Sequence, residues 1–209
     1  MSFSEIARLS VFLCLPQESV VTVSPLLVFA HADEAEAFAA QGVPHLITGV
    51  GKVNAAFALT RALLEDGPHP GRRVVVLGTA GALSDDAWLD TVYQVEAVVQ
   101  HDFSLPSPTL RPGGAQLDVP TAIIATGDVF VQNDAQREAL AALGASLVDM
   151  ETYAYSAVCE RLGVPLQVFK VPSDFADSAT TQDEWDSVAV SKSEQLLAFA
   201  ERYLPELFV

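Results

Sequence analysis

The sequence has few basic residues. Only 11 Lys and Arg residues stand against 27 Asp and Glu residues in a chain of 209, which gives a formal net charge of −16. An acidic surface of this kind repels phosphate backbones and anionic lipid headgroups. We therefore expect neither a nucleic acid nor a membrane as a partner.

Cysteines and long apolar runs are also scarce. Cys14 and Cys159 fit no CxxC or Cys/His spacing, so we expect reduced thiols and neither a disulfide framework nor a metal site. No apolar run reaches the roughly 20 residues of a transmembrane helix. Residues 1–24 carry charges of both signs near their start and lack an A-x-A cleavage pattern, which disfavours a signal peptide. We expect a cytoplasmic protein with an N-terminal extension over residues 1–24 and a folded domain over residues 25–209.

Half of the residues are apolar, which is enough for the core of one domain. Short apolar runs alternate with helical stretches, a pattern typical of βαβ units. The expected strands are 25–30, 45–48, 74–78, 91–99, 121–127, 146–150 and 165–171. The expected helices end near residue 65, end at residue 144, span 152–162 and run on from residue 184. The predicted fold class is α/β, a single domain with a mostly parallel central β-sheet flanked by helices.

Residues suited to chemistry follow the expected strands. In open α/β sheets a ligand lies beyond the carboxyl ends of the strands. The residues at those ends are Glu34, 49–51, 79–81, 128–131, 150–151 and 173–174. This edge of the sheet is therefore the predicted site.

A glycine-rich turn, Gly49-Val-Gly51, follows the second expected strand. Glycines there let the backbone approach a ligand, and the following helix offers free N–H groups. The dinucleotide fingerprint also needs a third small residue and an acid that closes the next strand. Asn54 and Gly78 occupy those places, so we disfavour a Rossmann dehydrogenase. A simple tight turn remains the alternative.

Two carboxylates, Glu151 and Asp174, end strands. An acid at a helix start complements the helix dipole, which is the structural interpretation of Glu151. The functional interpretation is that its two oxygens accept hydrogen bonds from the vicinal hydroxyls of a sugar. Asp174 is either an acid catalyst or a turn former.

Five motifs taken together favour the functional interpretation. TGVGKVNAA, LGTAGAL, ATGDVFV, LVDMETYA and SDFAD occur in this order from about Leu26 to the C-terminal helix. In sequence and spacing they resemble the methylthioadenosine/S-adenosylhomocysteine nucleosidases of the nucleoside phosphorylase superfamily. The resemblance implies a nucleoside phosphorylase-like fold, hydrolysis of the N-glycosidic bond of a 5′-modified purine nucleoside, and no metal or organic cofactor. It also implies a homodimer, for which Phe103 and Leu105 are our candidate contact residues.

The same resemblance implies roles for individual residues. Glu34 would activate the attacking water, and Asp174, oriented by Ser173, would protonate purine N7. Phe130 would stack on the purine, and Glu151 would bind the ribose hydroxyls. The implied substrate-binding residues are Val50, Thr79, Ala80, Gly81, Phe130, Val131, Met150, Glu151 and Ser173.

The sequence departs from the nucleosidase pattern at three places. The stretch between Tyr93 and Thr121 is short. Lys170 and Pro172 occupy positions at which the family has arginine and an aliphatic residue. His101-Asp102 resembles a His-Asp element of the family, with a structural turn as the alternative. These departures concern the 5′ substituent more than the reaction.

Three alternatives to a methylthioadenosine or S-adenosylhomocysteine hydrolase stay open. The first is hydrolysis of futalosine or of purine nucleosides in general. The second is phosphorolysis, which requires cationic groups at an anion site. The third is a non-catalytic nucleoside-binding protein. We expect His31, His45 and His69, which show no metal-ligand spacing, to lie in loops or at the surface.

Overall fold

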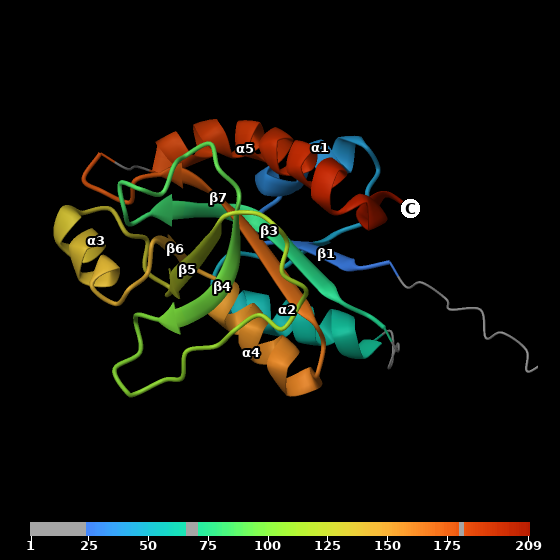
Figure 1. Ribbon diagram of the computed structural model, residues 1–209, viewed down its shortest axis with the longest axis horizontal. Coiled ribbons are helices and arrows are strands. Elements are labelled where there is room, and N and C mark those ends of the chain that lie inside the picture. The colour runs from blue at the N-terminus through green and yellow to red at the C-terminus, as the bar shows by residue number, and fades with distance from the viewer. Residues whose placement is uncertain (1–23, 66–70, 180–181) are drawn as a thin grey trace, which may run out of the picture.

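The computed structural model describes residues 24–65, 71–179 and 182–209. The predicted extension over 1–24 therefore lies outside the described residues except for its last position. Within these described ranges, seven strands form one sheet (Figure 1). They are β1 (Leu26–Phe29), β2 (Leu46–Ile47), β3 (Val74–Ala82), β4 (Tyr93–Gln100), β5 (Thr121–Thr126), β6 (Leu147–Asp149) and β7 (Leu166–Asp174).

The sheet is mixed and closes on itself. Its order is β2-β1-β3-β6-β5-β4-β7, and β7 also pairs with β3 along its whole length. β6 runs antiparallel to β3 and β4 antiparallel to β7, while the other pairings are parallel. The α/β class is therefore confirmed, but the prediction of a mostly parallel sheet is wrong. Apolar runs indicate that a strand is buried and do not encode the direction of its neighbour.

Two long strands cause the closure. β3 and β7 extend beyond their predicted apolar runs, and their register shifts between Ala80 and Gly81. Beyond this irregularity β3 pairs with β6 at Gly81 and Ala82. Such an irregularity increases twist and re-aims side chains, which brings the carboxyl ends of several strands around one space.

Helices cover the two faces of the sheet (Figure 1). The helical elements are the 3₁₀ turn η1 (Asp33–Ala35), α1 (Glu36–Ala40), α2 (Lys52–Glu65), α3 (Asp134–Ala141), α4 (Thr152–Leu162), α5 (Gln182–Tyr203) and η2 (Pro205–Phe208). α2 and α4 pack with one apolar cluster, which contains Leu59, Val76 and Tyr155. α1 and α5 pack with a second cluster, which contains Phe38 and Leu196. None of the helices in the described ranges has the length and apolar character needed to span a membrane.

Candidate active site

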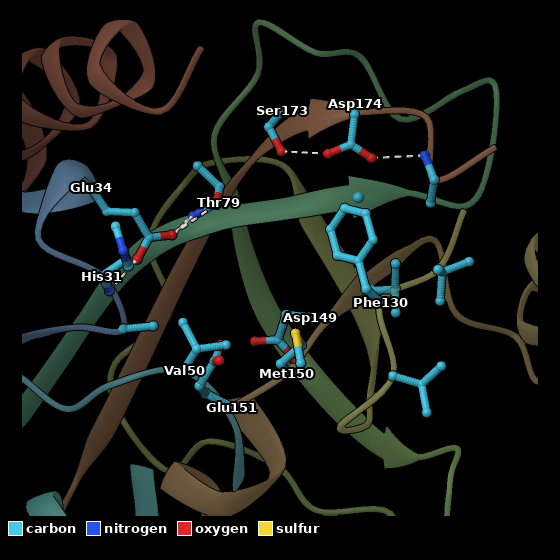
Figure 2. Close-up of a pocket in the computed structure, with 16 residues that line it drawn as sticks. His31, Glu34, Val50, Thr79, Phe130, Asp149, Met150, Glu151, Ser173 and Asp174 are labelled. Atoms are coloured by element: carbon cyan, nitrogen blue, oxygen red, sulfur yellow. Dashed lines mark hydrogen bonds between the residues drawn. The ribbon is translucent and has the colours of Figure 1, made fainter. Parts of the chain in front are cut away.

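A cavity opens at the carboxyl ends of β1, β3, β6 and β7. Figure 2 shows Glu34 on one side of it and Asp174 on the other, with Phe130 beside Asp174. Its lining residues are Ala30, His31, Glu34, Val50, Thr79, Gly81, Val129, Phe130, Val131, Val148, Asp149, Met150, Glu151, Ser173, Asp174 and Ala176. The structure thus brings together every predicted site residue except Ala80.

Ala80 is the exception because of strand alternation. Successive side chains of a strand point to opposite faces. Thr79 and Gly81 line the cavity, while the buried Ala80 belongs to the apolar cluster under α2 and α4. The prediction that Ala80 lines the site is therefore wrong, although its carbonyl accepts a hydrogen bond from Ser173 Oγ at 3.4 Å.

Glu34 is buried in the 3₁₀ turn that follows β1. Its Oε1 accepts hydrogen bonds from the backbone N–H and the hydroxyl of Thr79, both at 2.7 Å, and Oε2 accepts one from the His31 N–H at 3.1 Å. A carboxylate has about four acceptor positions, so three donors fix its orientation and leave capacity for a water molecule. The geometry suits a base with one defined direction.

Asp174 ends β7 on the opposite side of the cavity. Its Oδ2 accepts a hydrogen bond from Ser173 Oγ at 2.7 Å, and its Oδ1 accepts one from the Ala176 N–H at 2.8 Å. Ala176 has a positive φ of 50°, a conformation that costs energy for a residue with a side chain. The tight turn after β7 thereby aims the Asp174 carboxyl at the cavity.

Glu151 is the buried N-cap residue of α4. Its Oε1 accepts a hydrogen bond from the Gly51 N–H at 2.8 Å, so the glycine turn and the start of α4 meet at this carboxylate. Burial and the neighbouring Asp149 raise the pKa of Glu151 to about 8, against the opposing effects of Lys170 and the Gly51 N–H. Val50 and Met150 line the cavity beside it.

A buried ion pair lies behind Glu151. Lys170 of β7 is fully buried, and its Nζ lies 3.0 Å from Asp149 Oδ2. Asp149 also accepts hydrogen bonds from the hydroxyls of Thr126 at 2.6 Å and Thr152 at 2.5 Å. Although burial disfavours the ammonium, Asp149 and Glu151 raise the pKa of Lys170. The buried Lys170 ammonium therefore lies among the carboxyl groups of Asp149, Glu151 and Glu34, the part of the cavity that we call the sugar side after the role that the sequence predicts for Glu151.

Gly78 lets two of these charged groups approach each other. A Cβ at this position would lie 3.0 Å from Glu34 Oε1 and 3.2 Å from Lys170 Nζ. Both groups therefore occupy the space that any side chain at Gly78 would fill. A substitution there would displace the Glu34 carboxylate or the Lys170 ammonium.

Sequence reasoning missed several residues of the site. Asp149 and Lys170 stood in predicted strands without an assigned role, and His31, expected in a loop or at the surface, lines the cavity. A lysine inside the mostly apolar run PLQVFKV was the available signal for a buried ion pair, since lysine is almost never fully buried unless it is paired. Nothing in the local sequence indicates that His31 lines the cavity. Within the described ranges, no group of three His, Cys, Asp or Glu side chains is arranged to hold a metal ion.

Comparisons with known proteins show which proteins this chain resembles in sequence. A family model described as the phosphorylase superfamily matches residues 109–205. A 5′-methylthioadenosine/S-adenosylhomocysteine nucleosidase of Marinomonas sp. is 28% identical over 189 residues, which cover 77% of this chain and 80% of that one. An aminodeoxyfutalosine nucleosidase of Helicobacter pylori is 28% identical over 153 residues, covering 61% of this chain and 65% of that one.

Solved structures have the same fold. A Helicobacter pylori 5′-methylthioadenosine/S-adenosylhomocysteine nucleosidase, crystallised with butyl-thio-DADMe-Immucillin-A, superposes with a TM-score of 0.72 at 21% identity. The superposition covers 85% of this chain and 97% of that one. These matches confirm the resemblance stated from the five motifs.

Proposed function

We propose that this protein hydrolyses the N-glycosidic bond of a 5′-modified purine nucleoside, methylthioadenosine or S-adenosylhomocysteine, and releases adenine and the ribosyl product. The observation that supports this most directly is the pair of carboxylates across one cavity. Glu34 is held by three donors on one side, and Asp174 is held by Ser173 on the other. Two carboxyl groups in different environments are the usual basis for separate base and acid roles.

The chemistry assigns one role to each group. Breaking the bond builds positive charge on the sugar and negative charge on the departing purine. Asp174 would donate a proton to purine N7 and so neutralise the leaving group, with Phe130 stacked on the base. Glu34 would accept a proton from the water that attacks the anomeric carbon. General acid–base catalysis of this kind is typically worth about 10²–10⁴-fold.

The sugar would lie between these two groups. Glu151 would accept hydrogen bonds from the ribose hydroxyls, and Val50 and Met150 would contact the sugar and its 5′ side. Lys170 balances the charge of the carboxylates here without lining the cavity. Positive charge that develops on the ribose in the transition state would therefore meet a wall rich in carboxylates, which favours bond cleavage.

Phosphorolysis is disfavoured by the charge of the same wall. Among the residues that the structure describes, no Lys or Arg lines the cavity, and Lys170 behind it is already paired with Asp149. A phosphate dianion about 4 Å from Glu34 would meet a repulsion of order 1 kcal/mol per charge pair even at the dielectric constant of water. Water is therefore the better nucleophile for this site.

Aminodeoxyfutalosine or futalosine is the second candidate substrate, because the Helicobacter pylori relative bears the name aminodeoxyfutalosine nucleosidase. A panel of methylthioadenosine, S-adenosylhomocysteine, futalosine and adenosine, each with and without phosphate, tests both candidates. The proposed function predicts release of free base at a rate that phosphate does not change. Binding of these nucleosides without turnover would contradict it.

We further propose a cytoplasmic homodimer whose nucleosidase domain spans residues 25–209. Three apolar side chains along α2 support the dimer: Val53, Phe57 and Leu64 are 78%, 66% and 60% exposed. Phe103 and Leu105 of the short segment after β4 are also exposed. Exposed apolar patches on a soluble chain commonly mark an interface. Light scattering at micromolar concentration tests this, and a fully active monomer would contradict it.

A further inference from the structure

Three charged residues form a closed set of hydrogen bonds directly outside the cavity. Lys52 Nζ lies 2.5 Å from Asp102 Oδ1, and Asp102 Oδ2 accepts a hydrogen bond from the Asp128 N–H at 2.7 Å. Asp128 Oδ1 in turn accepts one from the Lys52 N–H at 2.7 Å. We call Lys52, Asp102 and Asp128 the outer triad. It joins the start of α2 to the segments that follow β4 and β5.

The outer triad is one residue away from the sugar side of the site. The N–H groups of Gly51 and Lys52 are consecutive, and they donate to Glu151 inside the cavity and to Asp128 outside it. A Cβ at Gly51 would lie 3.1 Å from Asp128 Oδ1, so the Asp128 carboxylate packs closely against the glycine turn, where Gly51 has a φ of 95°. Because the two N–H groups belong to adjacent residues, we expect a displacement of the Lys52 N–H also to displace the N–H that holds Glu151.

The outer triad also adjoins the segment that carries Phe130. Asp128 directly precedes Val129, Phe130 and Val131, which line the cavity. The Asp128 N–H is held by Asp102, so one carboxylate restrains the start of this wall and, through Lys52, the glycine turn.

The charges of Lys52 and Asp102 in the outer triad stabilise each other. Although partial burial opposes ionisation, the hydrogen bonds from Lys52 and from the Asp128 N–H lower the pKa of Asp102. Lys52 Nζ also donates to Gln100 Oε1 at 2.9 Å. The ammonium thus bridges the end of β4 and the carboxylate that follows it.

We propose that the Lys52–Asp102 ion pair positions Glu151, by fixing the glycine turn whose Gly51 N–H donates to that carboxylate. Lys52 and Asp102 are positioning residues, since neither lines the cavity. This assigns a role to Asp102 in the His101-Asp102 element. The inference rests on the proposed function, in which Glu151 binds the ribose hydroxyls.

Steady-state kinetics of Asp102→Ala, Lys52→Met and Lys52→Arg tests the effect on turnover. Misplacing Glu151 is expected to lower kcat/KM for methylthioadenosine by about 10- to 100-fold in the first two variants. Lys52→Arg keeps the ion pair and is expected to stay within a few-fold of the wild type. Arg73→Met is the matched control, because it removes a 2.6 Å ion pair with Glu206 that lies away from the cavity.

Substrate selectivity separates positioning from general destabilisation. The ratio of kcat/KM for a nucleoside to that for its 2′,3′-dideoxy analogue measures recognition of the ribose hydroxyls. The ratio is expected to fall in Asp102→Ala and Lys52→Met and to stay unchanged in Arg73→Met. A ratio equal to that of the wild type in both test variants, at any overall activity, would overturn the inference.

A measurement without substrate tests the inference even if no nucleoside is hydrolysed. The pH titration of the Glu151 side-chain carboxyl carbon resonance reports the ionisation of Glu151, and the Gly51 amide resonance reports the hydrogen bond that Gly51 donates to it. The groups that face Glu151 are Asp149, Lys170, Glu34 and Tyr155, and these variants change none of them.

In Asp102→Ala, loss of the Asp102 charge and loss of the Gly51 hydrogen bond shift the pKa of Glu151 in opposite directions. Losing a negative charge alone would lower the midpoint of the Glu151 carboxyl titration, whereas losing the Gly51 hydrogen bond to Glu151 would raise it. We expect a raised Glu151 midpoint in Asp102→Ala and the wild-type midpoint in Lys52→Arg. A lowered or unchanged midpoint in folded Asp102→Ala would overturn the inference. If this variant does not fold, loss of the pH titration of the Gly51 amide resonance in Lys52→Met decides in favour of the inference, and a wild-type titration of that resonance decides against it.

Discussion

Glu34 and Asp174 are both carboxylates that face one cavity, yet their surroundings differ. Glu34 is 3% exposed and accepts three hydrogen bonds, and a buried lysine lies on the same side of Gly78. Asp174 is only half-buried, in a turn near the apolar Phe130 and Val131. The first environment holds one orientation of a deeply buried acceptor, while in the second Ser173 Oγ and the Ala176 N–H each donate to one oxygen of a less buried carboxyl group. In the proposed function, the Glu34 side of the cavity would serve the sugar and the water, and the Asp174 side would serve the leaving base.

The largest expected effect comes from replacing Lys170, the buried cation beside Asp149 and Glu151. Lys170→Met would leave Asp149 buried without its partner, and breaking a buried ion pair costs about 3–5 kcal/mol. We expect the free energy of unfolding to fall by that amount in urea denaturation. Arg73→Met, which breaks a half-exposed pair with Glu206, is the control and should cost about 0–1 kcal/mol. Equal small losses in both variants would mean that Lys170 does not balance the carboxylates.

Glu34→Gln tests the base directly. Gln keeps the shape of the side chain but cannot take a proton from water, so turnover should fall by about 10³-fold. Binding of adenine, which lies on the Asp174 side, should stay near that of the wild type by calorimetry. Turnover within tenfold of the wild type in a folded variant would remove the role of Glu34.

Asp174→Asn tests whether Asp174 acts on the leaving base while Glu34 acts on the water. Loss of the proton donor should lower turnover of purine nucleosides by about 10²-fold. A 4-nitrophenyl riboside has a leaving group that departs as a stable anion. Asp174→Asn should therefore hardly affect its hydrolysis, whereas Glu34→Gln should impair both substrates. A similar loss on both substrates in Asp174→Asn would argue against leaving-group protonation.

The last prediction concerns the dependence of stability on pH through Glu151. Its pKa is raised to about 8 in the folded protein by burial and Asp149, above the ordinary value of 4.5. A raised carboxyl pKa stabilises the fold at low pH, and this contribution is lost as pH rises from about 4.5 to about 8. The slope should be about 1.4 kcal/mol per pH unit, and Glu151→Gln should remove it. Parallel pH–stability curves for wild type and variant would contradict this.

Much of the fold was predictable from the sequence, because apolar runs such as 74–78 and 165–171 are buried strands. The direction of β4 and β6 was not predictable, since it depends on where two long strands twist and change register. No local sequence pattern encodes the pairing of β3 with β7 or its change of register.

In the site, too, the residues in local motifs were predictable and the contacts between distant segments were not. Glu34, Glu151 and Asp174 follow strands in motifs with a recognisable spacing, and all three line the cavity. Lys170 and Asp149 form their ion pair between β7 and β6, two strands that do not pair with each other in the sheet, so only the tertiary structure brings them together. Ala80 stood inside a correct motif but points to the opposite face of β3.

The most direct test of the central claim is product analysis with methylthioadenosine, with and without phosphate, for the wild type and Glu34→Gln. The account predicts free adenine and a free ribosyl sugar from the wild type, at a rate that phosphate does not change, and loss of both products in the variant. A sugar 1-phosphate among the products, or turnover that rises with phosphate, would contradict hydrolysis and leave Glu34 without a water to activate.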